Sequence, residues 1–203
     1  MDHAVGLVQA YLRLNGYFTV TEFPVVLPTA GGGYRTVTDL DILAVRFPHV
    51  SAAAAEANPP HRGAGLTLSD PALAAPEDQP DMLIGEVKEG GAELNAGATN
   101  PEVVEAVLRR FGCCDESSAP QVVRELHRRG HAVLPNGHPA RLVAFGSFAD
   151  PGAGGRYLRV THGHMLQFME RYIRTYWDRV RVGEAKDPAF GLLLLIEKAR
   201  RGR

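Results

Sequence analysis

The segment DMLIGEVK, residues 81–88, limits the possible folds more than any other part of the sequence. Its apolar run is typical of a strand covered on both faces of a sheet, yet it ends in the charged residues Glu86 and Lys88. Side chains alternate between the faces of a strand, so Met82 and Ile84 share one face with these two charged residues. The pattern therefore predicts a core strand whose far end places a carboxylate and an ammonium group side by side.

A second segment, VTDLDILAV, shows the opposite order along one face. That face begins with Asp39 and Asp41 and continues with the apolar Leu43. The two patterns are complementary if the strands are antiparallel neighbours, because their apolar halves then meet over the core. Neighbouring strands lie only about 4.8 Å apart, so Asp41 would fall near Glu86 and Lys88. The sequence predicts that two carboxylates and a lysine converge at one edge of a sheet.

The rest of the chain predicts an α/β fold with a mixed central β-sheet flanked by helices. Helical spacing predicts a first helix that ends at Gly16, and the run YFTVTEFPVVL is expected to form a hairpin with VTDLDILAV. Residues 48–80 are rich in Ala and Pro and indicate a mobile insertion. Two helices and the strand ARLVAFGSF follow DMLIGEVK, and residues 161–203 are expected to form a helical C-terminal region. The length of 203 residues suits one domain, residues 1–203.

The charge balance excludes a general attraction to polyanions. The chain has 22 Lys and Arg residues against 23 Asp and Glu residues, so nucleic-acid binding would need a local basic patch. The segment ERYIRTYWDRVR offers one, because Arg171 and Arg174 are interleaved with aromatic residues that can stack on bases. The alternative, which helical spacing favours, is that the aromatic residues pack on the sheet and the arginines form a solvated face.

The cysteine content and the N-terminus predict a soluble cytoplasmic protein with no membrane partner. Cys113 and Cys114 are adjacent, and neighbouring thiols rarely form a disulfide or a metal framework, which favours a reducing compartment. The N-terminus lacks the basic and then apolar pattern of a signal peptide. The apolar run FGLLLLIEK is too short to span a bilayer.

Two carboxylates beside a lysine suit metal-assisted hydrolysis of a phosphodiester. The carboxylates of Asp41 and Glu86 can hold Mg²⁺ or Mn²⁺ with several waters in place, and the backbone carbonyl of Val87 can fill another ligand position. Lys88 can stabilise the attacking hydroxide or the charge that develops on phosphorus. Asp39 lies on the same face as Asp41 and is the alternative ligand, or else a group that contacts phosphate.

At these residues the chain resembles the PD-(D/E)XK nuclease superfamily, whose members share the restriction-endonuclease-like fold. The resemblance covers roughly residues 3–147: an opening helix, a hairpin that supplies Asp41 in DLDIL, and a strand that ends in EVK. It implies that Asp41 and Glu86 bind Mg²⁺ or Mn²⁺ and that Lys88 is the catalytic lysine. It also implies a nuclease that acts on DNA, and it is compatible with a homodimer.

One departure from the family pattern leaves a second function open. Many members carry a glutamate on the first helix that reaches the metal, whereas this helix offers only Gln9 and, before it, Asp2. Gln9 is then a candidate contact to nucleic acid. Glu22 on the first strand is either a substitute ligand or, as its position favours, a solvated residue. The alternative function is a catalytically inactive module with the nuclease fold that binds nucleic acid or a protein partner.

Two further patterns are more consistent with structural roles. His162 and His164 lie at a helix start, and we expect them to cap or pack rather than to bind metal. The Gly-Ser pair of FGS follows the acids of DLD, which is the reverse of the order in nucleotidyltransferases and argues against that class.

Overall fold

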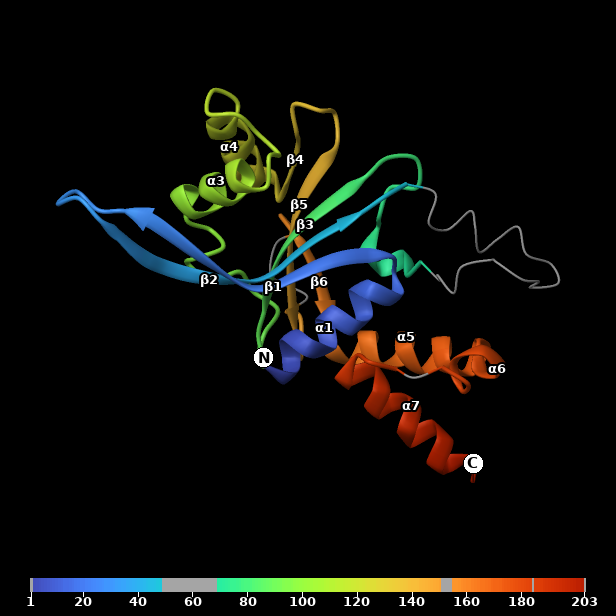
Figure 1. The fold of residues 1–203 in the computed structure, drawn as a ribbon. Coiled ribbons are helices and arrows are strands. Elements are labelled where there is room, and N and C mark those ends of the chain that lie inside the picture. The colour runs from blue at the N-terminus through green and yellow to red at the C-terminus, as the bar shows by residue number, and fades with distance from the viewer. Residues whose placement is uncertain (1, 49–68, 151–154, 184, 203) are drawn as a thin grey trace.

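The computed structural model describes residues 2–48, 69–150, 155–183 and 185–202, and within these parts it contains a six-stranded sheet (Figure 1). The strands are β1 (Tyr17–Pro28), β2 (Tyr34–Arg46), β3 (Asp81–Val87), β4 (His131–Val133), β5 (Pro139–Gly146) and β6 (Leu158–Thr161). They pair in the order β1-β2-β3-β5-β4, and β6 also pairs with β5. The β3–β5 and β5–β6 pairs are parallel and the others antiparallel, so the sheet is mixed, as predicted.

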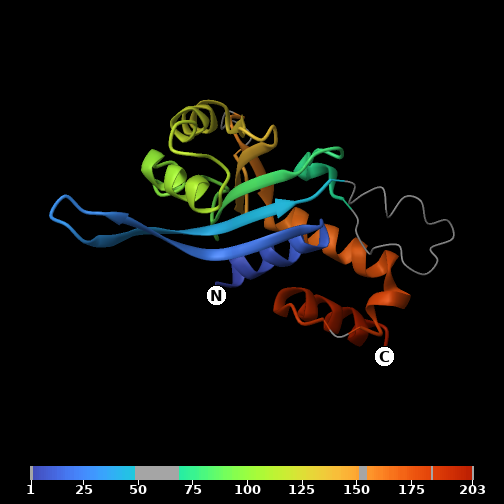
Figure 2. The ribbon, with the colours of Figure 1, turned by 45° about the horizontal axis from the view of Figure 1, so that its top comes forward.

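Helices cover both faces of this sheet (Figure 2). They are α1 (His3–Leu14), α3 (Pro101–Arg110), α4 (Ala119–Arg129), α5 (His162–Thr175), α6 (Trp177–Val180) and α7 (Pro188–Arg200). α1 and α5 pack on one face, where Leu83 and Phe145 lie in the same buried cluster as residues of both helices. α3 and α4 pack on the other face, over Leu43 and Ile84. The predicted class, an α/β fold with a mixed sheet flanked by helices, is therefore confirmed.

Local sequence explains where the first elements begin and end. Asp2 caps α1 by accepting a hydrogen bond from the amide of Ala4, and Gly16 follows the helix with a φ of 84°. The turn between β1 and β2 holds Gly32 and Gly33 at φ values of 77° and 120°, which residues with a side chain rarely adopt. The predicted first helix and the hairpin after it are both present.

The chain between β2 and β3 rejoins the packed structure before β3 begins. Most of the predicted insertion, residues 48–80, lies outside the described residues. Its last part, residues 69–80, is described and packs against the rest of the fold. Asp70 is 2% exposed, and its Oδ2 lies 2.9 Å from the Tyr11 hydroxyl and 2.6 Å from Nε2 of His164. Leu73, in a short 3-10 helix, is fully buried. This last part is packed against α1 and α5 rather than mobile.

The C-terminal region is helical, with two differences from the prediction. The short strand β6 precedes it and extends the sheet beside β5, although the sequence predicts no strand there. The helix expected to run through HMLQFMERYIRTYWDRV is divided, since α5 ends at Thr175 and α6 begins at Trp177. Among the described residues, none of the helices has both the length and the apolar character needed to cross a membrane.

Candidate functional site

The two predicted carboxylates lie at the same end of neighbouring strands. The last pair in the antiparallel register of β2 and β3 is Ile42 opposite Gly85, so Asp41 and Glu86 occupy the next positions. Both point to the face that α3 and α4 cover, because Ile84, two residues before Glu86, belongs to the buried cluster on that face. The predicted antiparallel pairing of the two strands is confirmed.

Asp41 is held by the backbone of β3. Its Oδ2 accepts a hydrogen bond from the amide of Val87 at 2.8 Å, so the carboxylate continues the β2–β3 pairing beyond the last backbone pair. Burial raises the pKa of the Asp41 carboxyl, and the hydrogen bond from Val87 opposes this rise. The sequence predicts a role for the carbonyl of Val87, and the structure adds a role for its amide.

Glu86 is more deeply buried than Asp41, with 3% of its surface exposed. Its Oε1 accepts a hydrogen bond from Nδ2 of Asn95 and lies 3.6 Å from Nζ of Lys88. Its Oε2 is buried and has no hydrogen-bond partner among the described residues. Burial raises the pKa of Glu86 to about 7; the charge of Asp41 adds to this rise and the charge of Lys88 opposes it.

Lys88 lies between this buried pair and solvent. Its amide donates a hydrogen bond to the carbonyl of Phe145 at 2.9 Å, which extends the pairing of β3 with β5 by one residue. Its side chain is 37% exposed, and its ammonium group is the one that faces Oε1 of Glu86. The structure therefore brings Asp41, Glu86 and Lys88 together, with the lysine accessible to a ligand.

Two further acidic residues lie near Asp41: Glu22, which the sequence leaves open as a substitute ligand, and Asp2, which precedes the first helix. Glu22 lies on β1 at the position opposite Asp41 and has a φ of 50°, in the left-handed region. Its Oε1 accepts a hydrogen bond from the amide of Asp2 at 3.3 Å, and the Asp2 carboxylate contributes to the raised pKa of Asp41. Such a backbone conformation costs about 1–3 kcal/mol in a residue other than glycine and is often found at functional sites. No signal in the sequence marks it, since glutamate does not favour this conformation.

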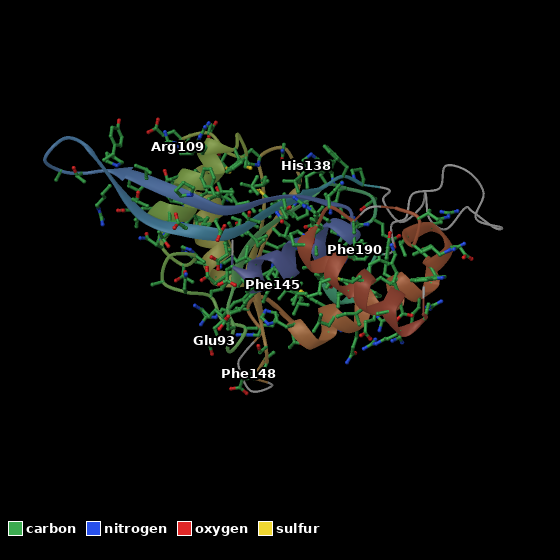
Figure 3. All side chains as sticks on the ribbon, turned by 60° about the horizontal axis from the view of Figure 1, so that its bottom comes forward. Glu93, Arg109, His138, Phe145, Phe148 and Phe190 are labelled. Atoms are coloured by element: carbon green, nitrogen blue, oxygen red, sulfur yellow. The ribbon has the colours of Figure 1, made fainter. Side chains whose placement is uncertain are left out.

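The loops after β3 and β5 meet beside the carboxylate pair. Gly91 and Phe148 form an isolated parallel bridge, and Figure 3 shows Glu93 and Phe148 at the same end of the molecule. Asn95 belongs to the same loop as Gly91 and Glu93. The loop thus supplies the side chain that holds Glu86, which the sequence pattern of the strands alone does not reveal.

His162 and His164 begin α5 in different environments. The amide of His164 donates to Oγ1 of Thr161, the N-cap residue, at 3.3 Å. Nδ1 of His162 lies 3.3 Å from Oγ of Ser147, and its Nε2 is buried without a hydrogen-bond partner among the described residues. Burial lowers the pKa of His162, although the carboxylates of Asp2 and Glu89 oppose this. The two histidines therefore contact separate parts of the fold.

The structure does not bring Gln9 or Asp39 into contact with the carboxylate pair. Gln9 lies on α1, which covers the opposite face of the sheet, and its Nε2 lies 3.4 Å from Oγ1 of Thr19. Asp39 is exposed on β2, whereas Asp41 is half-buried and held by Val87. These positions favour Asp41 over Asp39 as the ligand and give Gln9 a contact with β1.

Arg171 and Arg174 are exposed on α5, and the aromatic residues between and after them are not. Tyr172 is 2% exposed and Trp177 is 9% exposed, so the aromatic residues pack in the fold. Arg174 forms an ion pair with Glu170 at 3.3 Å. It lies about 18 Å along the helix axis from the start of α5, where β6 ends. The structure therefore matches the packing alternative for this segment and does not bring the two arginines to the site.

Comparisons of the chain with protein-family models, curated proteins and solved structures find no match. Membership of the PD-(D/E)XK superfamily stays a prediction. Within the described parts of the chain, no group of three or more His, Cys, Asp or Glu side chains is placed to hold a metal ion. A cation at this site would be held by the carboxylates of Asp41 and Glu86, together with a backbone oxygen and water.

Proposed function

We propose that the chain is a divalent-metal-dependent nuclease that hydrolyses phosphodiester bonds in DNA, with Asp41 and Glu86 as metal ligands. The observation that carries this proposal is the buried Oε2 of Glu86, which accepts no hydrogen bond from a donor group among the described residues. It belongs to a carboxylate close enough to that of Asp41 for the two to share a hydrogen bond when one of them is protonated. An ionised carboxylate in such a place is costly unless a proton or a cation compensates its charge. Mg²⁺ or Mn²⁺ bound by both carboxylates would provide that compensation.

The contacts of each residue support a distinct part in the reaction. Bound Mg²⁺ or Mn²⁺ would supply a hydroxide at neutral pH and stabilise the negative charge that develops at phosphorus. The amide of Val87 keeps Asp41 oriented, and Asn95 keeps Glu86 oriented. Lys88, on the solvent side of the pair, can contact a phosphate oxygen and stabilise charge in the transition state, which would make it the catalytic lysine.

A restriction-endonuclease-like core is part of the same proposal. The element order supports it: α1 is followed by the β1–β2 hairpin, then β3 with EVK, then α3 and α4, then the short β4, and then β5, which is parallel to β3. In this order the acid of the hairpin, Asp41, and the acid of the central strand, Glu86, come from the two strands that the resemblance requires.

A second function, a catalytically inactive module that binds nucleic acid or a protein partner, is favoured by one observation. The first helix contributes no carboxylate to the site, because His3–Leu14 contains no Asp or Glu, and Gln9 contacts Thr19 on the opposite face. Although Glu22 and Asp2 lie near Asp41, no group of three or more His, Cys, Asp or Glu side chains among the described residues could hold a metal ion. Such a module would bind DNA equally well without a divalent cation.

A cleavage assay separates the two functions. Plasmid, single-stranded and branched DNA are each incubated with the protein in Mn²⁺ or in chelator, and both cleavage and binding are measured. The nuclease proposal predicts cleavage of at least one substrate in Mn²⁺ and of none in chelator. Binding to DNA without cleavage under either condition would support the inactive module and contradict the proposed activity.

A further inference from the structure

A cavity of about 730 Å³ lies beside α4, between that helix, β5 and the segments that precede β6 and follow β3. Small-molecule sites usually measure about 300–1,000 Å³, so the cavity can hold a ligand the size of a nucleotide. Leu94, Leu126 and Leu142 provide an apolar lining. One wall of the cavity therefore suits a flat, apolar ring.

The polar residues of the cavity suit an anion. Arg156 and Arg159 line it, and the guanidinium carbon of Arg159 lies 4.1 Å from the centre of the Tyr157 ring. Its Nε also donates a hydrogen bond to the carbonyl of Ala92 at 3.1 Å, so the side chain is held in position. No carboxylate is found among the described residues that line the cavity. The guanidinium group of Arg159, held beside an aromatic ring, and the second guanidinium group of Arg156 on the cavity wall are together suited to bind a phosphate.

His127 adds a ring nitrogen that is available for a hydrogen bond to a ligand. It lines the cavity from α4, and its Nε2 is buried without a hydrogen-bond partner among the described residues. Burial lowers the pKa of His127, so the imidazole is neutral at neutral pH and either donates or accepts a hydrogen bond at Nε2, depending on its tautomer. A polar atom on a base would satisfy it.

The cavity lies on the same face of the sheet as the carboxylate pair. Glu86 on β3 is in register with Ala144 on β5, and Ala144 is in register with Arg159 on β6. These three positions form a row across the sheet, with two strand spacings, or roughly 10 Å, between Glu86 and Arg159. Leu94 of the cavity wall is the neighbour in sequence of Asn95, which binds Glu86. The same loop therefore borders the cavity and the carboxylate pair.

We propose that this cavity binds one nucleotide unit, with its phosphate at Arg156 and Arg159 and its base between the apolar wall and His127. A DNA strand held there would be fixed a few nucleotides from the phosphodiester at Asp41 and Glu86. That the bound nucleotide belongs to a substrate strand rests on the proposed function. That the cavity can bind a nucleotide at all rests only on its size and its lining residues.

The test measures the binding of deoxyadenosine 5′-monophosphate by calorimetry in the presence of chelator. Deoxyadenosine and inorganic phosphate, each of which is one part of the mononucleotide, are measured as partial ligands. The mononucleotide should bind more tightly than either partial ligand, because it alone engages both walls. His127→Ala and Arg156→Ala should each weaken its binding roughly tenfold or more. Arg128→Ala, an exposed arginine next to His127 on α4, should not. Arg156 is also exposed, so its substitution should leave the fold intact.

Absence of mononucleotide binding, or equal binding by wild type, His127→Ala and Arg156→Ala, would overturn the inference even if the wild-type protein cleaves DNA in Mn²⁺. Mononucleotide binding that depends on these residues, in a protein that cleaves no DNA, would support the cavity's assignment and contradict the nuclease proposal. A tetranucleotide that binds no more tightly than the mononucleotide would overturn the placement of a substrate strand.

Discussion

Replacing Glu86 with Gln should make the metal-free protein more stable at neutral and alkaline pH. The amide preserves the size of the side chain and its contact with Asn95 but removes the charge. In the wild-type protein, burial and the charge of Asp41 raise the pKa of Glu86 from 4.5 to about 7. Between pH 4.5 and about pH 7, the folded state therefore keeps a proton on Glu86 that the unfolded state has released. The stability that this proton provides is fully present below pH 4.5 and is lost as the pH rises to about 7.

The raised pKa sets the size of the effect. The difference between a pKa of 4.5 and one of about 7 corresponds to about 3 kcal/mol of unfolding free energy, at about 1.36 kcal/mol for each unit of pKa. Glu86 is 3% exposed, so solvent screens little of this energy. The wild-type protein should lose up to about 3 kcal/mol between pH 4 and pH 8 through this group. The Glu86→Gln protein should lack this loss and be the more stable of the two at pH 8.

Urea unfolding in chelator from pH 4 to pH 8, followed by circular dichroism, measures the difference directly. Glu77→Gln is the matched control, because Glu77 is an exposed glutamate shortly before the same strand and its substitution should leave the pH profile unchanged. Parallel pH profiles for wild type and Glu86→Gln would contradict this prediction, since they would mean that the pKa of Glu86 is not raised by burial and by the charge of Asp41.

Three further predictions concern the lysine, the far end of the sheet and the insertion. Lys88→Met should slow Mn²⁺-dependent cleavage in single-turnover assays by roughly 10²–10³-fold while changing stability by only about 0–1 kcal/mol, and a wild-type rate would remove Lys88 from the mechanism. Arg141→Met should destabilise the fold by about 3–5 kcal/mol in urea titrations. The substitution removes the ion pair, at 2.5 Å, of the fully buried Asp81 carboxylate, and a loss below about 1 kcal/mol would contradict this expectation. Replacing residues 50–68 with a Gly/Ser linker should spare Mn²⁺ binding measured by calorimetry, since β2 ends and β3 begins at the opposite end of the sheet from Asp41. Loss of that binding in a folded protein would show that the segment contributes to the site.

The pairing of β2 with β3 could be predicted because both strands carry strong, opposed patterns. In DMLIGEVK and VTDLDILAV the apolar and charged positions of one face match only in the antiparallel arrangement, and the observed register places Asp41 beside Glu86. The helices were equally accessible to prediction, since Asn100 and Asp187 cap the first turns of α3 and α7. These signals are local in the sequence, and the strands and helix starts of the structure agree with them.

The features that were not predictable depend on contacts distant in sequence. Asp70 lies in a segment dominated by Ala and Pro, and only the folded chain brings it to Tyr11 and His164. β6 is four residues long and, among the described residues, pairs only with β5, so its own sequence carries too little periodicity to reveal it. Asn95 reaches Glu86 from a loop. The left-handed backbone of Glu22 lies where the pairing of β1 with β2 skips one position, between Thr21 and Phe23, and nothing in its local sequence indicates it.

The rate of Mn²⁺-dependent DNA cleavage by the wild-type and Asp41→Asn proteins is the most direct test of the central claim that Asp41 and Glu86 form a metal-dependent nuclease site. Asparagine keeps an oxygen that can accept the hydrogen bond from Val87 but lacks the charge that a divalent cation requires. The wild-type protein should cleave DNA in Mn²⁺ but not in chelator. Asp41→Asn should cleave it under neither condition, although the variant stays folded and binds DNA in chelator as the wild type does. Cleavage by the wild-type protein in chelator, or an undiminished rate for Asp41→Asn, would contradict the proposed site.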